Sequence, residues 1–319
     1  MELYEANRIL RSVKTALAAD GYKLPSSAET DGLLMLLGKL DVEKYLAPKI
    51  KHVRAQDKSS ASYNRTCKLI SFFRALQAVE KGLPDPVTAT SMIILHKSVT
   101  GDFNDDAGKI RSTDVTTCGS AHTDPKYISG SVKSIIAKMN EIVSAPTNSK
   151  EDFASYLSHY MRELIILHPF ERCSEFTIRI FIMMFCKIKG FSLGYYRATP
   201  PALKDAEQKA FATDDVAPLF TMFTECLSYD HKTVQPTPPP ARTRREVAKD
   251  LCRPSRAPSQ PPPAPTPTEK QGKAAPKKQK STEPDDDVIK RAIRLQQKIS
   301  KLNEQLTELI KPLDGGNDD

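Results

Sequence analysis

The 319-residue chain contains no tryptophan, no internal repeat and no long apolar run. Its most apolar stretch, residues 178–186, is interrupted by Arg179 and is far too short to cross a bilayer. The first residues do not combine a basic segment with an apolar run, as a secretory signal would. We therefore expect an intracellular protein that makes no membrane contact.

Paired or metal-type cysteine spacing is also missing. The six cysteines are scattered as Cys67, Cys118, Cys173, Cys186, Cys226 and Cys252. Such a pattern is typical of reduced thiols in an intracellular protein, and we expect a cytoplasmic location, with nuclear import through the lysine-rich patch at 277–280 as an alternative. The histidines show no ligand spacing, so we predict no metal site.

The folded part has little net charge of either sign. The formal net charge is +8, but residues 233–284 hold 11 Lys and Arg against 4 Asp and Glu, which gives +7 in that segment alone. The basic balance therefore gives no reason to expect nucleic-acid binding by the folded part. The same segment contains 13 of the 24 prolines, and we predict a disordered Pro- and Lys-rich linker there, or else a ligand for proline-reading modules.

The region before the linker has few stretches that alternate with period two, which favours an all-α fold. Apolar residues at helical spacing predict helices at residues 33–40, 69–79, 92–96, 132–142, 153–167, 177–189 and 211–227. The polar stretch 101–127 predicts a long loop or hairpin, and such loops are often functional. We expect an N-terminal helical region at 1–65 and a core at 66–232.

A heptad pattern follows the linker. Val288, Ala292, Leu295, Ile299, Leu302, Leu306 and Leu309 alternate at spacings of four and three. This pattern predicts a short coiled-coil helix at 285–313 that forms a homo-oligomer or binds a partner through residues 288–309. A lone amphipathic helix that docks on the globular part is the alternative.

Residues 168–179 read His-Pro-Phe-Glu-Arg-Cys-Ser-Glu-Phe-Thr-Ile-Arg. The first three and last three resemble the Fic signature H-P-F-x-D/E-G-N-G-R-x-x-R in order and spacing. Residues 107–112 resemble the flap sequence A-G-K/E-Y/I/F-R-S/T that precedes the signature in that family, and residues 124–128 resemble the P-P-x-x-I after it. Residues 59–64 resemble the inhibitory motif S-S-x-I-E-G/N. Together these motifs cover roughly residues 30–230.

The resemblance implies a Fic-like helical domain with a short flap hairpin and, in intact members, transfer of AMP from ATP to a protein hydroxyl. His168 would be the general base, although it could instead satisfy backbone groups at a helix end. ATP and Mg would be cofactors only if the protein is active. Arg172, Ser174 and Arg179 are the candidate cofactor-binding residues.

Two further motifs carry expectations from the same resemblance. Gly108, Lys109 and Arg111 would form a flap that binds a protein target, although Arg111 could simply bridge loops. Ser59, Tyr63 and Asn64 would be the remnant of the inhibitory motif, with Tyr63 in place of its glutamate.

The sequence departs from the Fic pattern in the middle of the signature. Arg172 replaces the metal-binding acid, Cys173 and Glu175 replace the glycines, and Phe176 replaces the first arginine. Ser174 replaces the asparagine and, with Glu175, could form an ordinary helix N-terminus. We expect a Fic-fold protein that is catalytically impaired and acts as a binding or regulatory module. The alternative is an active transferase that moves AMP or another phosphate-containing group onto a protein hydroxyl, with His168 as base.

Overall fold

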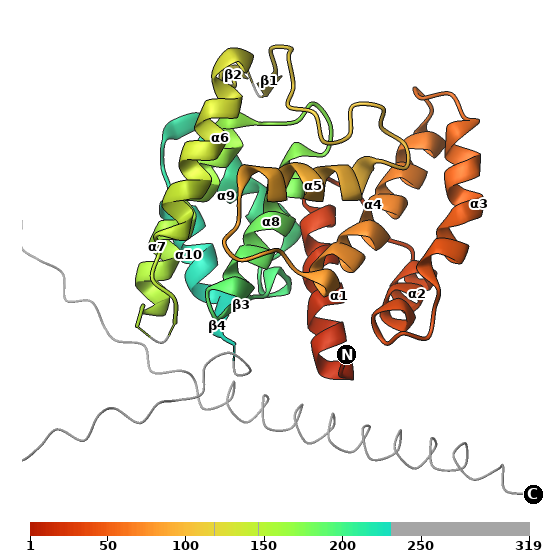
Figure 1. Cartoon of the computed structure of the whole chain (residues 1–319), viewed down its shortest axis with the longest axis horizontal. Helices are drawn as coiled ribbons and strands as arrows, with labels where there is room; N and C mark the ends of the chain where they lie inside the picture. Colours follow the sequence, from red (N-terminus) through yellow and green to blue (C-terminus); the bar gives the residue numbers. More distant parts are fainter. Residues whose placement is uncertain (118, 146, 231–319) are drawn as a thin grey trace, which may run out of the picture. The chain divides into compact units, whose positions relative to one another are not determined.

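The computed structural model describes residues 1–117, 119–145 and 147–230 (Figure 1). The expected linker and coiled coil lie outside the described residues, so both stay predictions. Residues 1–230 belong to one compact unit. The expected boundary at residues 65 and 66 falls inside a helix that spans residues 61–81, so the N-terminal helices continue directly into the core.

The described part of the chain is all-α, as predicted, with two small two-stranded sheets. Its helices are α1 (Leu3–Ala18), α2 (Ser26–Leu36), α3 (Val42–Arg54), α4 (Ala61–Lys81), α5 (Ala89–Thr100), α6 (Pro125–Asn140), α7 (Lys150–Leu167), α8 (Ser174–Ile188), α9 (Pro200–Thr213) and α10 (Ala217–Cys226), with a 3₁₀ turn at Tyr195–Arg197. None of the helices in these described residues is both long and apolar enough to traverse a bilayer.

Helix α8 lies at the centre of the fold. Every side chain from Phe176 to Cys186 is buried, and the helix packs against α1, α4, α5, α7 and the strand β3 (Phe191–Leu193). A helix that is apolar on all sides must be enclosed by its neighbours. The core therefore fixes the position of the residues at the start of α8, where the signature loop joins it.

The predicted hairpin is present but short. Strands β1 (Thr116–Thr117) and β2 (Ser120–Ala121) pair antiparallel, with Thr116 opposite Ala121 and Thr117 opposite Ser120. In Figure 1 the hairpin lies beyond the N-terminal end of α6. The rest of the polar stretch before it is irregular, and we refer to residues 101–128 as the flap.

The expected helix 211–227 is corrected to two helices. Asp214 adopts a left-handed conformation with φ of 61° at the end of α9, and Pro218 stands at the start of α10. Proline cannot continue a preceding helix but is tolerated in a first turn. Residues 227–229 then form β4 (Leu227–Tyr229), which pairs antiparallel with β3.

Candidate functional site

The signature residues form a tight loop between α7 and α8. His168 caps the C-terminus of α7 in a left-handed conformation with φ of 43°, and Cys173 precedes α8 with φ of 54°. Such backbone conformations cost L-residues about 1–2 kcal/mol. Cys173 thus adopts a left-handed backbone conformation that glycine would reach more readily. Helix α8 begins at Ser174 with Glu175 in its first turn, so the two residues do form a helix N-terminus, but the capping position is Cys173.

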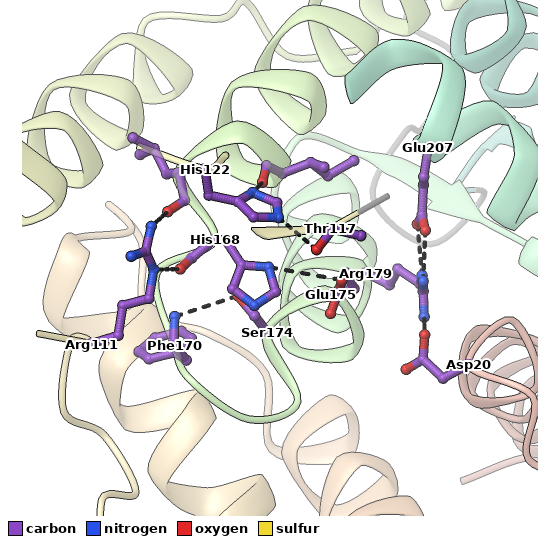
Figure 2. A network of polar contacts seen from close by, with 12 residues as sticks. Asp20, Arg111, Thr117, His122, His168, Phe170, Ser174, Glu175, Arg179 and Glu207 are labelled. Atoms are coloured by element: carbon purple, nitrogen blue, oxygen red, sulfur yellow. Dashed lines mark hydrogen bonds and ion pairs between the residues drawn. The ribbon is translucent and has the colours of Figure 1, made fainter. Parts of the chain in front are cut away.

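The His168 imidazole is almost completely buried beside an acid. Its side chain is 8% exposed, and its Nδ1 lies 3.8 Å from Oε1 of Glu175 (Figure 2). Nδ1 has no hydrogen-bond partner. Burial lowers the pKa of His168 to about 4, and the nearby charge of Glu175 opposes that shift. His168 is therefore neutral near neutral pH.

Glu175 places a negative charge at the N-terminus of α8. Its side chain is 23% exposed. Burial acts to raise the pKa of its carboxyl, but interactions with His168, its own backbone N–H, Lys204 and Arg179 bring the net pKa below the ordinary value. A helix N-terminus stabilises an anion by its unpaired N–H groups and its dipole. The carboxylate of Glu175 therefore takes up the favourable environment that a phosphate would need.

His122 links the flap to the signature loop. Its ring centroid lies 4.5 Å from that of His168 and 4.3 Å from that of Phe211. Its Nδ1 donates to the carbonyl of Ile165 at 3.1 Å, and its Nε2 accepts from the Thr117 hydroxyl at 2.8 Å. Burial lowers the pKa of His122. This role was not predictable from the sequence, because the acceptor Ile165 lies 43 positions away along the chain.

The target-binding role expected for Arg111 is corrected by its contacts. Its side chain is buried and donates to four backbone carbonyls, those of Thr113, Thr123, Leu167 and His168, at 2.5–3.1 Å. Figure 2 shows the guanidinium turned toward the loop. The alternative that it bridges loops describes this geometry. Arg111 thus anchors the flap to the end of α7.

His96 on α5 forms a second bridge between the flap and the loop. The N–H of Gly108 donates to its Nδ1 at 2.9 Å, so Nε2 carries the proton and donates to the carbonyl of Arg172 at 3.0 Å. The ring also stacks on Phe170, with centroids 3.8 Å apart. Burial lowers the pKa of His96 to about 4. This role of His96 was not predictable from the sequence, because Arg172 lies 76 positions away.

Arg179 is corrected from a candidate phosphate contact to a buried structural residue. Its fully buried guanidinium donates to both carboxylate oxygens of Glu207 at 2.6 Å and to Asp20 at 2.8 Å. It also donates to the carbonyl of Ala16. Burial alone would lower the pKa of Arg179, but the two carboxylates raise it well above the ordinary value. The side chain has no surface left to offer a ligand.

The remaining candidate cofactor residues are divided between core and solvent. Ser174 is fully buried, and its Oγ accepts from the N–H of Phe170 at 3.4 Å, so its hydroxyl faces into the loop. This corrects its assignment as a cofactor contact. The side chain of Arg172 is exposed. Burial raises the pKa of the Cys173 thiol to about 12, so it is not a thiolate at neutral pH.

The expected inhibitory-motif remnant lies at the start of α4. Ser60 caps this helix by accepting from the N–H of Tyr63 at 3.0 Å. The Tyr63 ring is 2% exposed, and its hydroxyl donates to the carbonyl of Phe103 in the flap at 3.0 Å. Ser59 bonds Asp57 at 2.6 Å, and Asn64 is exposed. Tyr63 therefore holds the flap through the carbonyl of Phe103, and its side chain is uncharged.

The two remaining flap candidates differ in exposure. Gly108 has φ of 80°, and an added Cβ there would lie 3.1 Å from Cβ of Lys97 and 3.4 Å from the carbonyl oxygen of Ile93. Lys109 is exposed and pairs with Asp106 at 2.9 Å. Gly108 thus allows close packing of the flap on α5, and Lys109 remains on the surface.

The loop does not fit a magnesium-bound nucleotide. Arg172 stands where a metal-binding acid is needed, Glu175 brings negative charge to the α8 N-terminus, and Arg179 is enclosed by carboxylates. Within residues 1–117, 119–145 and 147–230, no group of three or more His, Cys, Asp or Glu residues could hold a metal ion.

Comparison with known proteins supports the Fic resemblance. The sequence profile of the Fic/DOC family matches residues 86–186. A probable protein adenylyltransferase Fic of Salmonella typhimurium is 24% identical over 198 residues, which cover 60% of this chain and 95% of the relative. The Escherichia coli protein of the same description is 25% identical over 134 residues, covering 42% of this chain and 66% of that protein.

Solved structures with similarity include Bartonella effector proteins. BepC of Bartonella tribocorum, crystallised with bound AMPPNP, gives a TM-score of 0.47 at 17% identity and covers 52% of this chain and 86% of that chain. The N-terminal Fic domain of a Bep protein from Bartonella sp. AR 15-3 gives 0.49 at 17% identity, with 56% and 88% covered.

Proposed function

We propose that this chain, which carries a Fic domain and is related to protein adenylyltransferases, binds an extended protein segment along its flap and transfers AMP poorly or not at all. It would act as a binding or regulatory module. The proposal rests on the charge and the packing of the signature loop, residues 168–175.

The carboxylate of Glu175 is the observation that carries this proposal. It lies at the α8 N-terminus, beside His168. Two unit charges about 4 Å apart repel by about 4 kcal/mol at an effective dielectric of 20. One charge-assisted hydrogen bond contributes about 1.5–3 kcal/mol, so a single such contact does not offset the repulsion. A phosphate at this helix end would meet an anion already in place.

The candidate arginines support the same conclusion. Arg179 is enclosed by Glu207 and Asp20, and Arg111 is committed to backbone carbonyls. The exposed Arg172 cannot serve as a metal ligand, because its guanidinium has no acceptor. Neither Arg111 nor Arg179 is therefore free to stabilise a phosphate.

The flap keeps the parts that a binding role needs. Strands β1 and β2 form a two-stranded ladder, and the outer edge of such a pair can add an extended peptide through main-chain hydrogen bonds. Arg111, His96 and His122 hold the flap against the loop through polar contacts. The binding edge would thus be held by rigid neighbours.

A second candidate function is an altered transferase with His168 as base. The observation that favours it is that His168 is neutral and its Nδ1 has no hydrogen-bond partner. A base must be unprotonated before it accepts a proton. Its low pKa makes it a weak base, and its Nδ1 faces Glu175. This candidate is the outcome that would contradict the proposal.

Nucleotide binding and transfer test the proposal on the full chain. Thermal unfolding is followed with and without millimolar ATP and magnesium, and labelled ATP is used to detect transfer to the protein itself or to lysate proteins. We expect no stabilisation and no label. A ligand at 100 times its Kd would add about 2.7 kcal/mol, which such a measurement detects readily.

Two variants sharpen the test. Glu175→Gln removes the negative charge but keeps the shape of the side chain, so we expect it to gain measurable nucleotide binding. Glu171→Gln removes a charge from an exposed residue of the same loop and should leave binding absent. Label on the unmodified chain that disappears in His168→Ala would refute the proposed loss of transfer activity.

A further inference from the structure

A recess lies at the opposite end of α8 from the signature loop. It has a volume of about 610 Å³ and is lined by the start of α1, the end of α4, the end of α8 and β3. Because α8 rises about 1.5 Å per residue, Met183 and Ile188 lie on the order of 14 Å or more from the start of α8. The recess is therefore separate from the flap and from His168.

The floor of the recess is apolar. Met183, Met184 and Ile188 of α8 line it, together with Phe191 and Leu193 of β3. Methionine side chains adapt their shape to different apolar partners, which is why they recur at binding surfaces for helices and peptides. At its edge, Tyr4 is 73% exposed. The floor and this edge offer anchoring sites for apolar side chains.

Carboxylates dominate the rim. The lining includes five acids, Glu2, Glu5, Glu80, Asp85 and Asp230, against three bases, Arg8, Lys81 and Lys187. Lys187 pairs with Glu5 at 3.6 Å, and Arg8 donates to the hydroxyl of Ser192. The excess of two acids gives the rim a negative character.

Two helix ends add to that character. Helix α4 ends at Lys81 and α8 ends at Ile188, and both of these residues line the recess. The C-terminus of a helix carries unpaired carbonyls and a partial negative charge, which attracts cations. The start of α1 also lines the recess and carries a partial positive charge, but the two C-terminal ends outnumber it, so the helix ends and the acids together favour a cationic ligand.

We propose that this recess binds a basic amphipathic segment of a partner protein. Leucine-type side chains on one face of the segment would enter the Met183–Ile188 floor, and lysine or arginine side chains that flank this face would meet Glu2, Glu80 and Asp85. An amphipathic helix that places apolar anchors at i, i+3, i+4 and i+7 has this chemistry. The proposal does not depend on the function assigned to the flap.

Binding of defined peptides to the full chain tests it. The probe is a labelled helical peptide with leucines at i, i+3, i+4 and i+7 and lysines at the other positions, and its binding is followed by fluorescence anisotropy. Two matched probes replace all lysines by glutamates or all leucines by serines. We expect the lysine–leucine peptide to bind with a Kd on the order of 10 μM, and each matched probe to bind at least about tenfold more weakly.

Surface variants locate the site. Glu2→Lys and Glu80→Lys change exposed residues at the rim, so the fold should be retained. We expect the pair to weaken binding of the lysine–leucine peptide about tenfold. Glu225→Lys is a control, because Glu225 is exposed on α10 and does not line the recess. Raising NaCl from about 50 mM to about 500 mM should also weaken binding, because exposed charge pairs are screened.

Several results would overturn the proposal. They are equal binding of the lysine and glutamate peptides, an affinity unchanged by Glu2→Lys and Glu80→Lys, and no binding of the lysine–leucine peptide at all. Binding only after Ile299→Ser and Leu302→Ser would also overturn it, since it would assign the recess to the chain's own heptad segment.

Discussion

Burial lowers the pKa values of His96, His122 and His168, and each ring has different neighbours. His96 accepts from Gly108 and donates to Arg172, and His122 accepts from Thr117 and donates to Ile165. His168 lacks a partner at Nδ1 and faces Glu175. For His96 and His122 the contacts fix which ring nitrogen carries the proton. At the residue scale, therefore, protonation of a single ring would break contacts that hold the flap.

The free energy of unfolding should decrease as the pH is lowered, and His96 should contribute to this decrease. Its pKa is about 4 in the folded chain, against an ordinary value of 6.5. Between these values the unfolded chain binds a proton that the folded chain does not, so the free energy of unfolding falls as pH drops, by up to about 1.4 kcal/mol per pH unit. We expect His96→Gln to reduce this slope in urea unfolding between about pH 5 and pH 7. Above pH 6.5 this contribution is fully present.

The control is His159→Gln, because His159 is exposed on α7 and holds no part of the flap. An acid slope identical in the unmodified chain and in His96→Gln would show that His96 does not carry the proton linkage. Loss of stability at pH 7 without a change of slope would reveal a purely structural role.

The sequence predicted the positions of the site residues along the chain better than it predicted the residues that they contact. The spacing of His168, Pro169 and Phe170 before an apolar stretch correctly placed a loop between two helices. The role of Arg179 was not predictable, because its acceptor Glu207 lies 28 positions away. For Arg111 the sequence left target binding and loop bridging as alternatives, because its acceptor His168 lies 57 positions away. Long-range burial decides whether an arginine serves a ligand or the core, and local spacing contains no such information.

At the element scale, the flap is an irregular segment held by a few polar contacts. The backbone N–H of Arg111 donates to the carbonyl of Pro169 at 3.0 Å, and Thr123 donates to Ile166 at 3.1 Å. Gly108 lets the segment approach α5 closely. The close approach of the flap to α5 therefore depends on Gly108, and its attachment to the rest of the fold depends on carbonyls at and just after the end of α7.

Gly108→Ala should loosen the flap. Its φ of 80° is unfavourable for alanine, and the new Cβ would press on Lys97 and Ile93. We expect a loss of more than about 1 kcal/mol in the free energy of unfolding. Gly21→Ala is the matched control, since Gly21 has φ of 76° with no atom within 4 Å of an added Cβ. Equal losses in the two variants would contradict a packing role for Gly108.

Some elements were harder to predict than others for physical reasons. Helix α9 buries Leu203, Ala206 and Ala210, and alanines give only a weak apolar stripe. Strands β3 and β4 have three residues each, too few to establish a period of two. In contrast α4 and α7 carry many large buried side chains, and their helical periodicity was clear.

At the scale of the whole molecule, the heptad segment at residues 288–309 should determine the oligomeric state. Apolar side chains at a and d positions bury surface only when another helix covers them. We expect light scattering over a range of concentrations to give the full chain a mass that is a multiple of its 35.5 kDa chain mass, and a chain that ends at residue 284 the mass of a single copy. A full-chain mass equal to that of one copy at every concentration would exclude self-association through this segment.

The buried cluster of Arg179 with Asp20, Glu207 and the carbonyl of Ala16 has a practical consequence for anyone who trims this protein for expression. The family profile covers residues 86–186, yet the guanidinium at its core is neutralised from outside that range, by α9 and by the end of α1. Removing one partner of a buried ion pair costs about 3–5 kcal/mol, a large part of the stability of a typical domain. A workable fragment must therefore begin before α1 and continue past α9, however well a shorter one fits the profile.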